Sequence, residues 1–114
     1  MTREKRAHTR VDRAVPVKVN IPVNDSDLVI QTKNISCSGA LCVADRHVEL
    51  MTKVVITMLL PQHNDLPSAK IVCNGVVVRA EEDITTGMCD LGIFFNDIRE
   101  KERAKLEHYI SHYV

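Results

Sequence analysis

The sequence has few aromatic residues and no tryptophan. Phenylalanine and tyrosine together make up 4% of the 114 residues. Small barrels that bind single-stranded nucleic acid stack the bases on aromatic side chains beside a basic groove. The aromatic residues of this chain stand toward its C-terminal end and mostly on apolar stripes, where core packing explains them. We therefore do not expect nucleic acid as a partner.

Long apolar runs are also missing. No stretch approaches the roughly 20 apolar residues that a membrane-spanning helix needs. The first 13 residues carry charges throughout and have no apolar segment behind them, unlike a secretory signal peptide. These observations predict a cytoplasmic protein, in which the four cysteines stay reduced. The cysteines are Cys37, Cys42, Cys73 and Cys89.

Patterns typical of metal sites and of catalysis are sparse. There is no CxxC pair, and although His108 and His112 have helical i, i+4 spacing, two histidines need at least a third ligand. A nucleophilic enzyme needs a base and an orienting group beside its serine or thiol. No histidine is adjacent in sequence to Ser36 or Ser38. We expect no metal, no cofactor and no enzymatic activity.

What the sequence does contain is an ordinary globular mixture of 45% hydrophobic and 26% charged residues, at the length of one domain. Positive and negative charges balance at 15 each, but cations are concentrated in the first 13 residues. These cations are Arg3, Lys5, Arg6, Arg10 and Arg13. The asymmetry predicts a flexible basic arm over residues 1–13 that meets an anionic ligand. A single compact domain over residues 14–114 would follow.

Alternating apolar and polar residues predict β-strands from residue 15 onward. The predicted strands cover residues 15–23, 28–32, 40–44, 53–60, 69–80 and 88–95. Pro16 and Pro22 indicate that the first strand is an edge strand or is partly unpaired. Gly75, inside the fifth run, indicates a bulge or a close approach of another backbone.

The C-terminal segment has helical periodicity. Its apolar stripe consists of Leu106, Tyr109, Ile110 and Tyr113, at positions i, i+3, i+4 and i+7. Asp97 followed by Glu100 predicts an N-cap with its capping-box partner. Six strands and one terminal helix predict a mainly β domain, and closing the sheet into a barrel would remove its exposed edges.

Two short segments carry the functional signal. One is Arg6-Ala7-His8-Thr9-Arg10, and the other, after the first predicted hairpin, is Asn34-Ile35-Ser36-Cys37-Ser38-Gly39. Together they resemble the RxxxR and [D/N]xSxxG motifs of the PilZ domain family. The order and separation of the motifs, the later segments 75–79 and 91–95 and the terminal helix agree with that family. The resemblance covers essentially the whole chain.

The resemblance implies a six-stranded antiparallel PilZ-type β-barrel with a C-terminal α-helix. It also implies a receptor for the bacterial second messenger cyclic di-GMP, which regulates an unidentified downstream protein partner by a changed surface, in motility, biofilm formation or virulence. Carried over by motif, the ligand-binding residues are Arg6, Arg10, Asn34, Ser36 and Gly39. One alternative stays open: a PilZ-like protein interaction module that binds no nucleotide.

The chemistry of these residues suits such a ligand. The planar fork of an arginine pairs with phosphate or with N7 and O6 of guanine, and it stacks on a base. Asn34 and Ser36, two residues apart at a strand, would aim an amide and a hydroxyl the same way. Gly39 would permit a turn or a close approach. Asn34 stands where many relatives have aspartate, so a neutral carbonyl replaces a two-oxygen acceptor.

Overall fold

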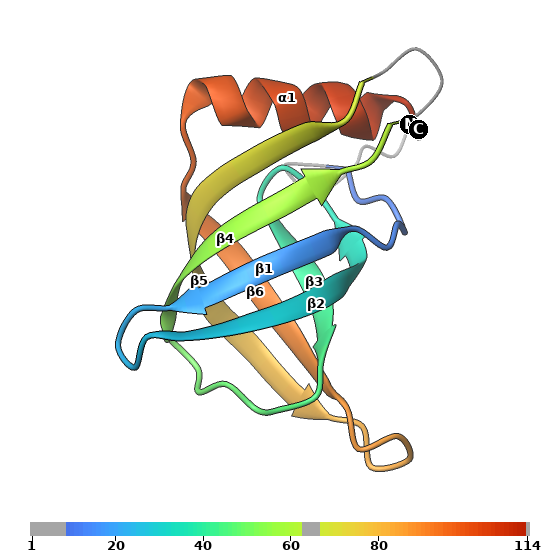
Figure 1. The fold of residues 1–114 in the computed structure, drawn as a ribbon. Coiled ribbons are helices and arrows are strands. Elements are labelled where there is room, and N and C mark those ends of the chain that lie inside the picture. The colour runs from blue at the N-terminus through green and yellow to red at the C-terminus, as the bar shows by residue number, and fades with distance from the viewer. Residues whose placement is uncertain (1–8, 63–66, 114) are drawn as a thin grey trace, which may run out of the picture.

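The computed structural model describes residues 9–62 and 67–113, which fold into six strands and one helix (Figure 1). In chain order these are β1 (Pro16–Ile21), β2 (Ser26–Ile35), β3 (Gly39–Ala44), β4 (Lys53–Leu60), β5 (Ala69–Glu82), β6 (Cys89–Asp97) and α1 (Glu100–Ser111). All pairings are antiparallel, and the order β1-β2-β3-β6-β5-β4 closes because β4 pairs with β1. The expected six-stranded barrel with a C-terminal helix is confirmed.

Alternation of side chains along the strands fills the inside of the barrel. In β1, Val17, Val19 and Ile21 are buried, whereas Lys18 and Asn20 lie on the outer face. The other strands repeat this period of two, because successive side chains of a strand point to opposite faces of the sheet. Each fully buried aliphatic side chain contributes roughly 1.5–3 kcal/mol. The barrel interior is therefore the hydrophobic core.

β1 is not an edge strand, but it is partly unpaired on the side of β4, which is the other possibility that its prolines indicated. β1 pairs with β2 on one side and with β4 on the other. Pro16 is the first residue of the strand, and the pairing with β4 starts only at Val17. Pro22 directly follows the last strand residue. Prolines at strand ends interrupt the ladders least, so the chain can close the barrel through this strand.

The segment before β1 is attached to the barrel. Val11 is buried, its N–H donates to the Ile35 carbonyl at 2.9 Å, and the Ile35 N–H donates back to the Val11 carbonyl at 3.0 Å. Part of the predicted arm over residues 1–13 thus packs on the core. Residues 1–8 lie outside the described residues, and the flexibility of the arm stays a prediction.

Helix α1 covers one end of the barrel beside the start of β5 (Figure 1). Leu106, Tyr109 and Ile110 are buried, which confirms the predicted apolar stripe. Tyr113 is the last member of the stripe. The guanidinium carbon of Arg13 lies over its ring, 4.0 Å from the ring centroid. In the part of the chain that the structure describes, no helix is long and apolar enough to cross a bilayer.

The predicted N-cap of this helix is wrong. Asp97 is the last residue of β6 rather than a cap, because it pairs with Asn74 of β5 and accepts a hydrogen bond from the Asn74 amide at 3.4 Å. The N-cap is Arg99, in extended conformation and with no side-chain cap. The sheet therefore continues two residues further than the helical pattern suggested.

Candidate functional site

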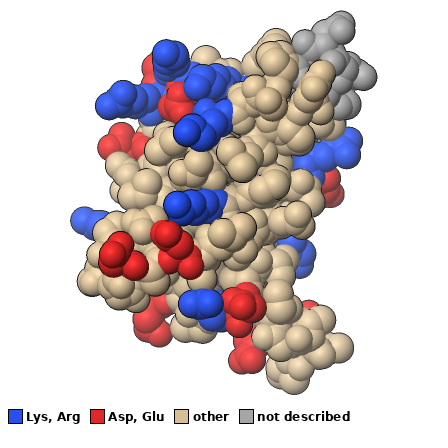
Figure 2. All heavy atoms as spheres, in the orientation of Figure 1, with Lys and Arg blue, Asp and Glu red and all other residues tan. Residues whose placement is uncertain are grey.

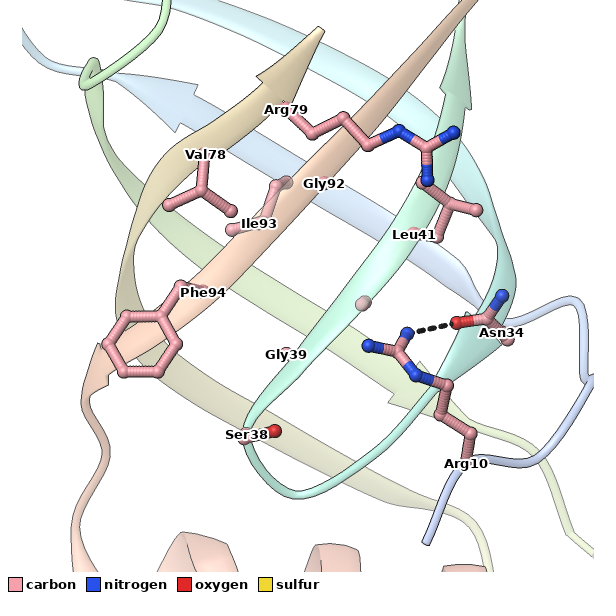
Figure 3. A pocket seen from close by; sticks show the side chains of 11 residues that line it. Arg10, Asn34, Ser38, Gly39, Leu41, Val78, Arg79, Gly92, Ile93 and Phe94 are labelled. Carbon is pink, nitrogen blue, oxygen red and sulfur yellow. Dashed lines mark hydrogen bonds between the residues drawn. The ribbon is translucent and has the colours of Figure 1, made fainter. Parts of the chain in front are cut away.

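A hollow on the outer face of the barrel brings the second motif together with three neighbouring strands (Figure 3). It lies over β5, β6 and β3, which are adjacent in the sheet. Its volume is about 410 Å³. The lining residues are Arg10, Asn34, Ser38, Gly39, Ala40, Leu41, Val78, Arg79, Gly92, Ile93 and Phe94.

The floor of this pocket is low because two of its residues are glycines. A Cβ on Gly39 would collide with the carbonyl oxygen of Ile93, so the expected close approach is confirmed. Gly92 lies on the next strand and adds no side chain to the floor. Beside the glycines, the side chains of Phe94 and Val78 are about half exposed, at 47% and 52%. The floor therefore offers an apolar surface with one aromatic face, suited to a flat ring.

A bulge in β2 turns Asn34 toward the pocket. The register between β2 and β3 shifts between Thr32 and Asn34, so Lys33 is an extra residue. Thr32 points inward and is buried, and strict alternation would have placed Asn34 inward as well. After the bulge Ile35 is the inward residue and Asn34 lies outside. Bulges re-aim side chains in this way beside binding sites.

A bulge in β5 places Arg79 at the same pocket. The register against β6 shifts twice: near Gly75 the extra residue is on β6, whereas at Val78 the extra residue is on β5. A Cβ on Gly75 would lie 3.1 Å from the carbonyl oxygen of Phe94, so the close backbone approach expected of this glycine is present, opposite a bulge of the facing strand. After the bulge of β5, Val78 and Arg79 are both exposed. The side chain of Arg79 then crosses Gly92. A Cβ on Gly92 would lie 2.9 Å from the Cβ of Arg79.

Arg10 enters the pocket from the segment that precedes β1. The next residue, Val11, is fixed by its two hydrogen bonds to Ile35. Arg10 Nη1 donates to Asn34 Oδ1 at 2.7 Å, the dashed line in Figure 3. Residues of the two motifs, 24 positions apart, therefore meet at one place. Arg6, the other arginine of the first motif, lies outside the described residues.

Ser36 does not line the pocket. β2 ends at Ile35, so alternation stops and the side chain of Ser36 turns inward, where it is 1% exposed. Its hydroxyl accepts the N–H of Ser38 at 3.2 Å, and its own N–H donates to the carbonyl of Gly39 at 2.9 Å. Ser36 thus holds the turn between β2 and β3, and it does not point the same way as Asn34. A direct ligand contact by Ser36 stays a prediction.

Three residues that were not predicted to bind the ligand also line the pocket, although each lies in a segment that resembles the family: Arg79, Ser38 and Phe94. One signal was available, since a glycine inside a strand, here Gly92, often marks a close approach of another group. The bulge at Val78 had no such signal, because valine is an ordinary strand residue. Without the bulge, alternation would have placed Arg79 inside the barrel.

Charged side chains elsewhere on the surface of the described residues are paired in part. Figure 2 shows cationic and acidic side chains intermixed over the N-terminal half of α1, at the upper left. There Lys105 lies 3.0 Å from Glu102, and Arg103 lies 4.0 Å from Glu100. The partner of Arg10, in contrast, is the neutral amide of Asn34. The pocket therefore contains an arginine that pairs with no acidic side chain of the described residues.

Comparisons with known proteins agree with the fold. A family model described as PilZ domain matches residues 4–112. No curated protein matches the chain at a significant level. Among solved structures, the inhibitor of motility MotI/DgrA from Bacillus subtilis has a TM-score of 0.79 and 18% identity, over 96% of this chain and 51% of that one. The chain thus spans about half the length of MotI/DgrA.

A second similar structure is the PilZ domain of YcgR from Escherichia coli, solved with c-di-GMP. Its TM-score is 0.69 at 10% identity, over 96% of this chain and 92% of that one. At such identities the two structures establish a shared fold. The family model, in contrast, matches the sequence itself, from residue 4 to residue 112. The chain belongs to the PilZ domain family.

Proposed function

We propose that this chain is a receptor for cyclic di-GMP, not an enzyme, and that the dinucleotide binds in the pocket of Figure 3. The observation that carries the proposal is the 2.7 Å hydrogen bond from Arg10 to Asn34, which unites both motifs in one pocket. Membership of the PilZ family and the likeness to the YcgR domain, whose structure contains c-di-GMP, support it.

The pocket supplies chemistry for each part of such a ligand. Arg10, together with Arg6 of the same motif, would pair with phosphate oxygens or with the N7 and O6 edge of a guanine. The ring of Phe94 offers a face on which a base can stack. Asn34 holds Arg10 in place and could turn its amide to the ligand. Gly39 keeps the floor low, and Ser36 holds the turn behind it.

The output of the receptor would be a changed surface. Because Arg10 precedes the anchored residue Val11, a ligand bound by Arg6 and Arg10 would order the segment before Val11 over the pocket. We propose that a downstream protein partner reads this ordered surface. Protection of residues 1–10 from proteolysis by the ligand would support this step, and unchanged cleavage would contradict it. We also propose a cytoplasmic location, because the proposed ligand is a bacterial second messenger.

Isothermal titration with cyclic di-GMP tests the proposal, with GTP as the control ligand. Losing one charge-assisted contact costs roughly 1.5–3 kcal/mol, or about 10- to 100-fold in affinity. We expect such a loss for Arg6→Ala and for Arg10→Ala. Arg46→Ala is a matched control, because Arg46 is an exposed arginine outside this pocket that pairs with Asp45. If the titration gives no binding heat and the ligand gives no thermal shift at high concentration, the alternative function remains: a protein interaction module that binds no nucleotide.

A further inference from the structure

The second arginine of the pocket, Arg79, already has a charged partner. Its guanidinium Nε lies 2.9 Å and its Nη2 lies 2.6 Å from the same carboxylate oxygen, Oε1 of Glu81. Both residues are on β5, two positions apart, and their side chains are 49% and 63% exposed. Glu81 itself does not line the pocket. The carboxylate therefore reaches the arginine from outside the place where a ligand would lie.

The donors that Glu81 occupies form one of the two edges by which an arginine can bind a ligand with two hydrogen bonds. An arginine recognises a phosphate, or the O6 and N7 edge of a guanine, with two neighbouring N–H groups of its planar fork. Nε–H and one Nη–H form such a pair, and in Arg79 both donate to Glu81. A ligand that takes Arg79 by this edge has to displace the carboxylate first. The displacement lowers the net gain from the contact.

The two arginines of the pocket thus differ in their partners. Arg10 donates to a neutral amide oxygen, and no carboxylate of the described residues pairs with its positive charge. Arg79 donates to a carboxylate, whose negative charge weakens the attraction of Arg79 for an incoming anion. Geometry keeps Arg79 over the pocket all the same, since it crosses the bare backbone of Gly92.

We propose that Glu81 is a built-in competitor of the ligand: it holds Arg79 while the pocket is empty and raises the cyclic di-GMP concentration at which the receptor fills. This inference rests on the proposed function, because it concerns the same ligand and the same pocket. The effect is bounded by the strength of an exposed ion pair, about 0.2–1 kcal/mol, which corresponds to an affinity change of up to about fivefold.

The test is titration of cyclic di-GMP into wild-type protein and four variants. Glu81→Gln removes the competing charge and is expected to raise the affinity about twofold to fivefold. Glu82→Gln is the matched control, because the neighbouring Glu82 is also exposed and carries the same charge, yet Arg79 does not bond to it. Its affinity should stay near that of the wild type. Arg79→Ala should bind more weakly, and adding Glu81→Gln to Arg79→Ala should change nothing further.

The outcomes separate the competitor role from the receptor function. Equal affinities for Glu81→Gln and Glu82→Gln would overturn the competitor role and leave the receptor intact. A gain from Glu81→Gln that persists in the Arg79→Ala background would overturn it too, because the effect would then not pass through Arg79. If none of the proteins binds cyclic di-GMP, the proposed function itself fails, and the competitor role fails with it.

Discussion

Single positions decide whether the pocket exists, and Gly39 is the clearest of them. In Gly39→Ala the new methyl group meets the carbonyl oxygen of Ile93, which is backbone and cannot rotate away. We expect a loss of about 1–3 kcal/mol in the free energy of unfolding, the usual cost of overpacking. The ligand should also bind more weakly, because the floor of the pocket rises. Urea unfolding and titration with cyclic di-GMP measure the two effects.

Gly87→Ala separates stability from binding. Gly87 has a φ of 75° in the turn between β5 and β6, and nothing lies within 4 Å of the position that a methyl group would take there. Its substitution therefore costs only backbone strain, of about 1–2 kcal/mol. This variant should lose stability and keep its affinity, whereas Gly39→Ala should lose both. Wild-type stability and affinity in Gly39→Ala would contradict the role given to the floor.

Among the secondary-structure elements, α1 is held to the sheet by polar contacts as well as by its apolar stripe. The pairing of β5 with β6 starts at Asn74, so the edge of β5 before that residue faces the helix. There the Glu102 carboxylate accepts the N–H of Val72 at 2.8 Å, and Lys105 donates to the carbonyl of Lys70 at 3.3 Å. Helix side chains thus take the place of a neighbouring strand at this edge.

Removing that carboxylate should loosen the helix. In Glu102→Ala we expect a loss of about 1 kcal/mol in the free energy of unfolding, since the contact is charged but partly solvated. Glu100→Ala is the control: it removes an acid from the same first turn, but Glu100 is 91% exposed. Thermal unfolding followed by circular dichroism compares them. Equal losses in both variants would assign the effect to the helix dipole rather than to the Val72 contact.

The contribution of Glu102 should also depend on pH. The hydrogen bond from the Val72 N–H, followed by the one from Lys105, lowers the pKa of Glu102 below its ordinary value of 4.5. A group whose pKa is lowered by folding stabilises the protein above the pKa of the unfolded chain. The difference in stability between wild type and Glu102→Ala should therefore be full above pH 4.5 and shrink as the pH falls through the lowered value.

Strand positions were predictable to different degrees for a physical reason. A period of two predicts where a strand runs, and residues 53–60 were predicted with the bounds that β4 has. A bulge, however, is an extra residue that only the partner strand reveals. Lys33 and Val78 look like ordinary strand residues, so the sequence could not show that Asn34 turns outward or that Arg79 reaches the pocket.

For the barrel as a unit, the choice of which strands pair was the step that local patterns could not supply. The pairing of β1 with β4 joins residues 35 to 41 positions apart and makes β1 an interior strand despite its prolines. The family resemblance supplied the barrel, because the two motifs carry information on topology that alternation lacks. The pocket was accordingly predicted at its two motifs, Arg10 with Asn34, and missed on the strands that closure brings beside them.

The closed core makes a prediction at high pH through Cys42. This residue of β3 is fully buried, and burial raises the pKa of its thiol from 9.0 to about 12. Because the folded pKa is the higher one, the stabilising contribution is full below pH 9.0 and is lost as the pH rises toward 12. Between these pH values the Cys42 thiol is ionised in the unfolded chain but not in the folded barrel. The free energy of unfolding should therefore fall by up to about 1.4 kcal/mol per pH unit.

Cys42→Ala isolates this thiol from the other groups that titrate at alkaline pH. The variant should be less stable than wild type at pH 7, because a buried sulfur is lost from a close-packed core. Its free energy of unfolding should nevertheless fall less steeply above pH 9, so that the two curves converge. Urea unfolding of both proteins at several pH values between 7 and 10.5 measures the two slopes. Parallel curves would mean that the thiol ionises inside the barrel as readily as in the unfolded chain, which requires water to reach β3 without global unfolding.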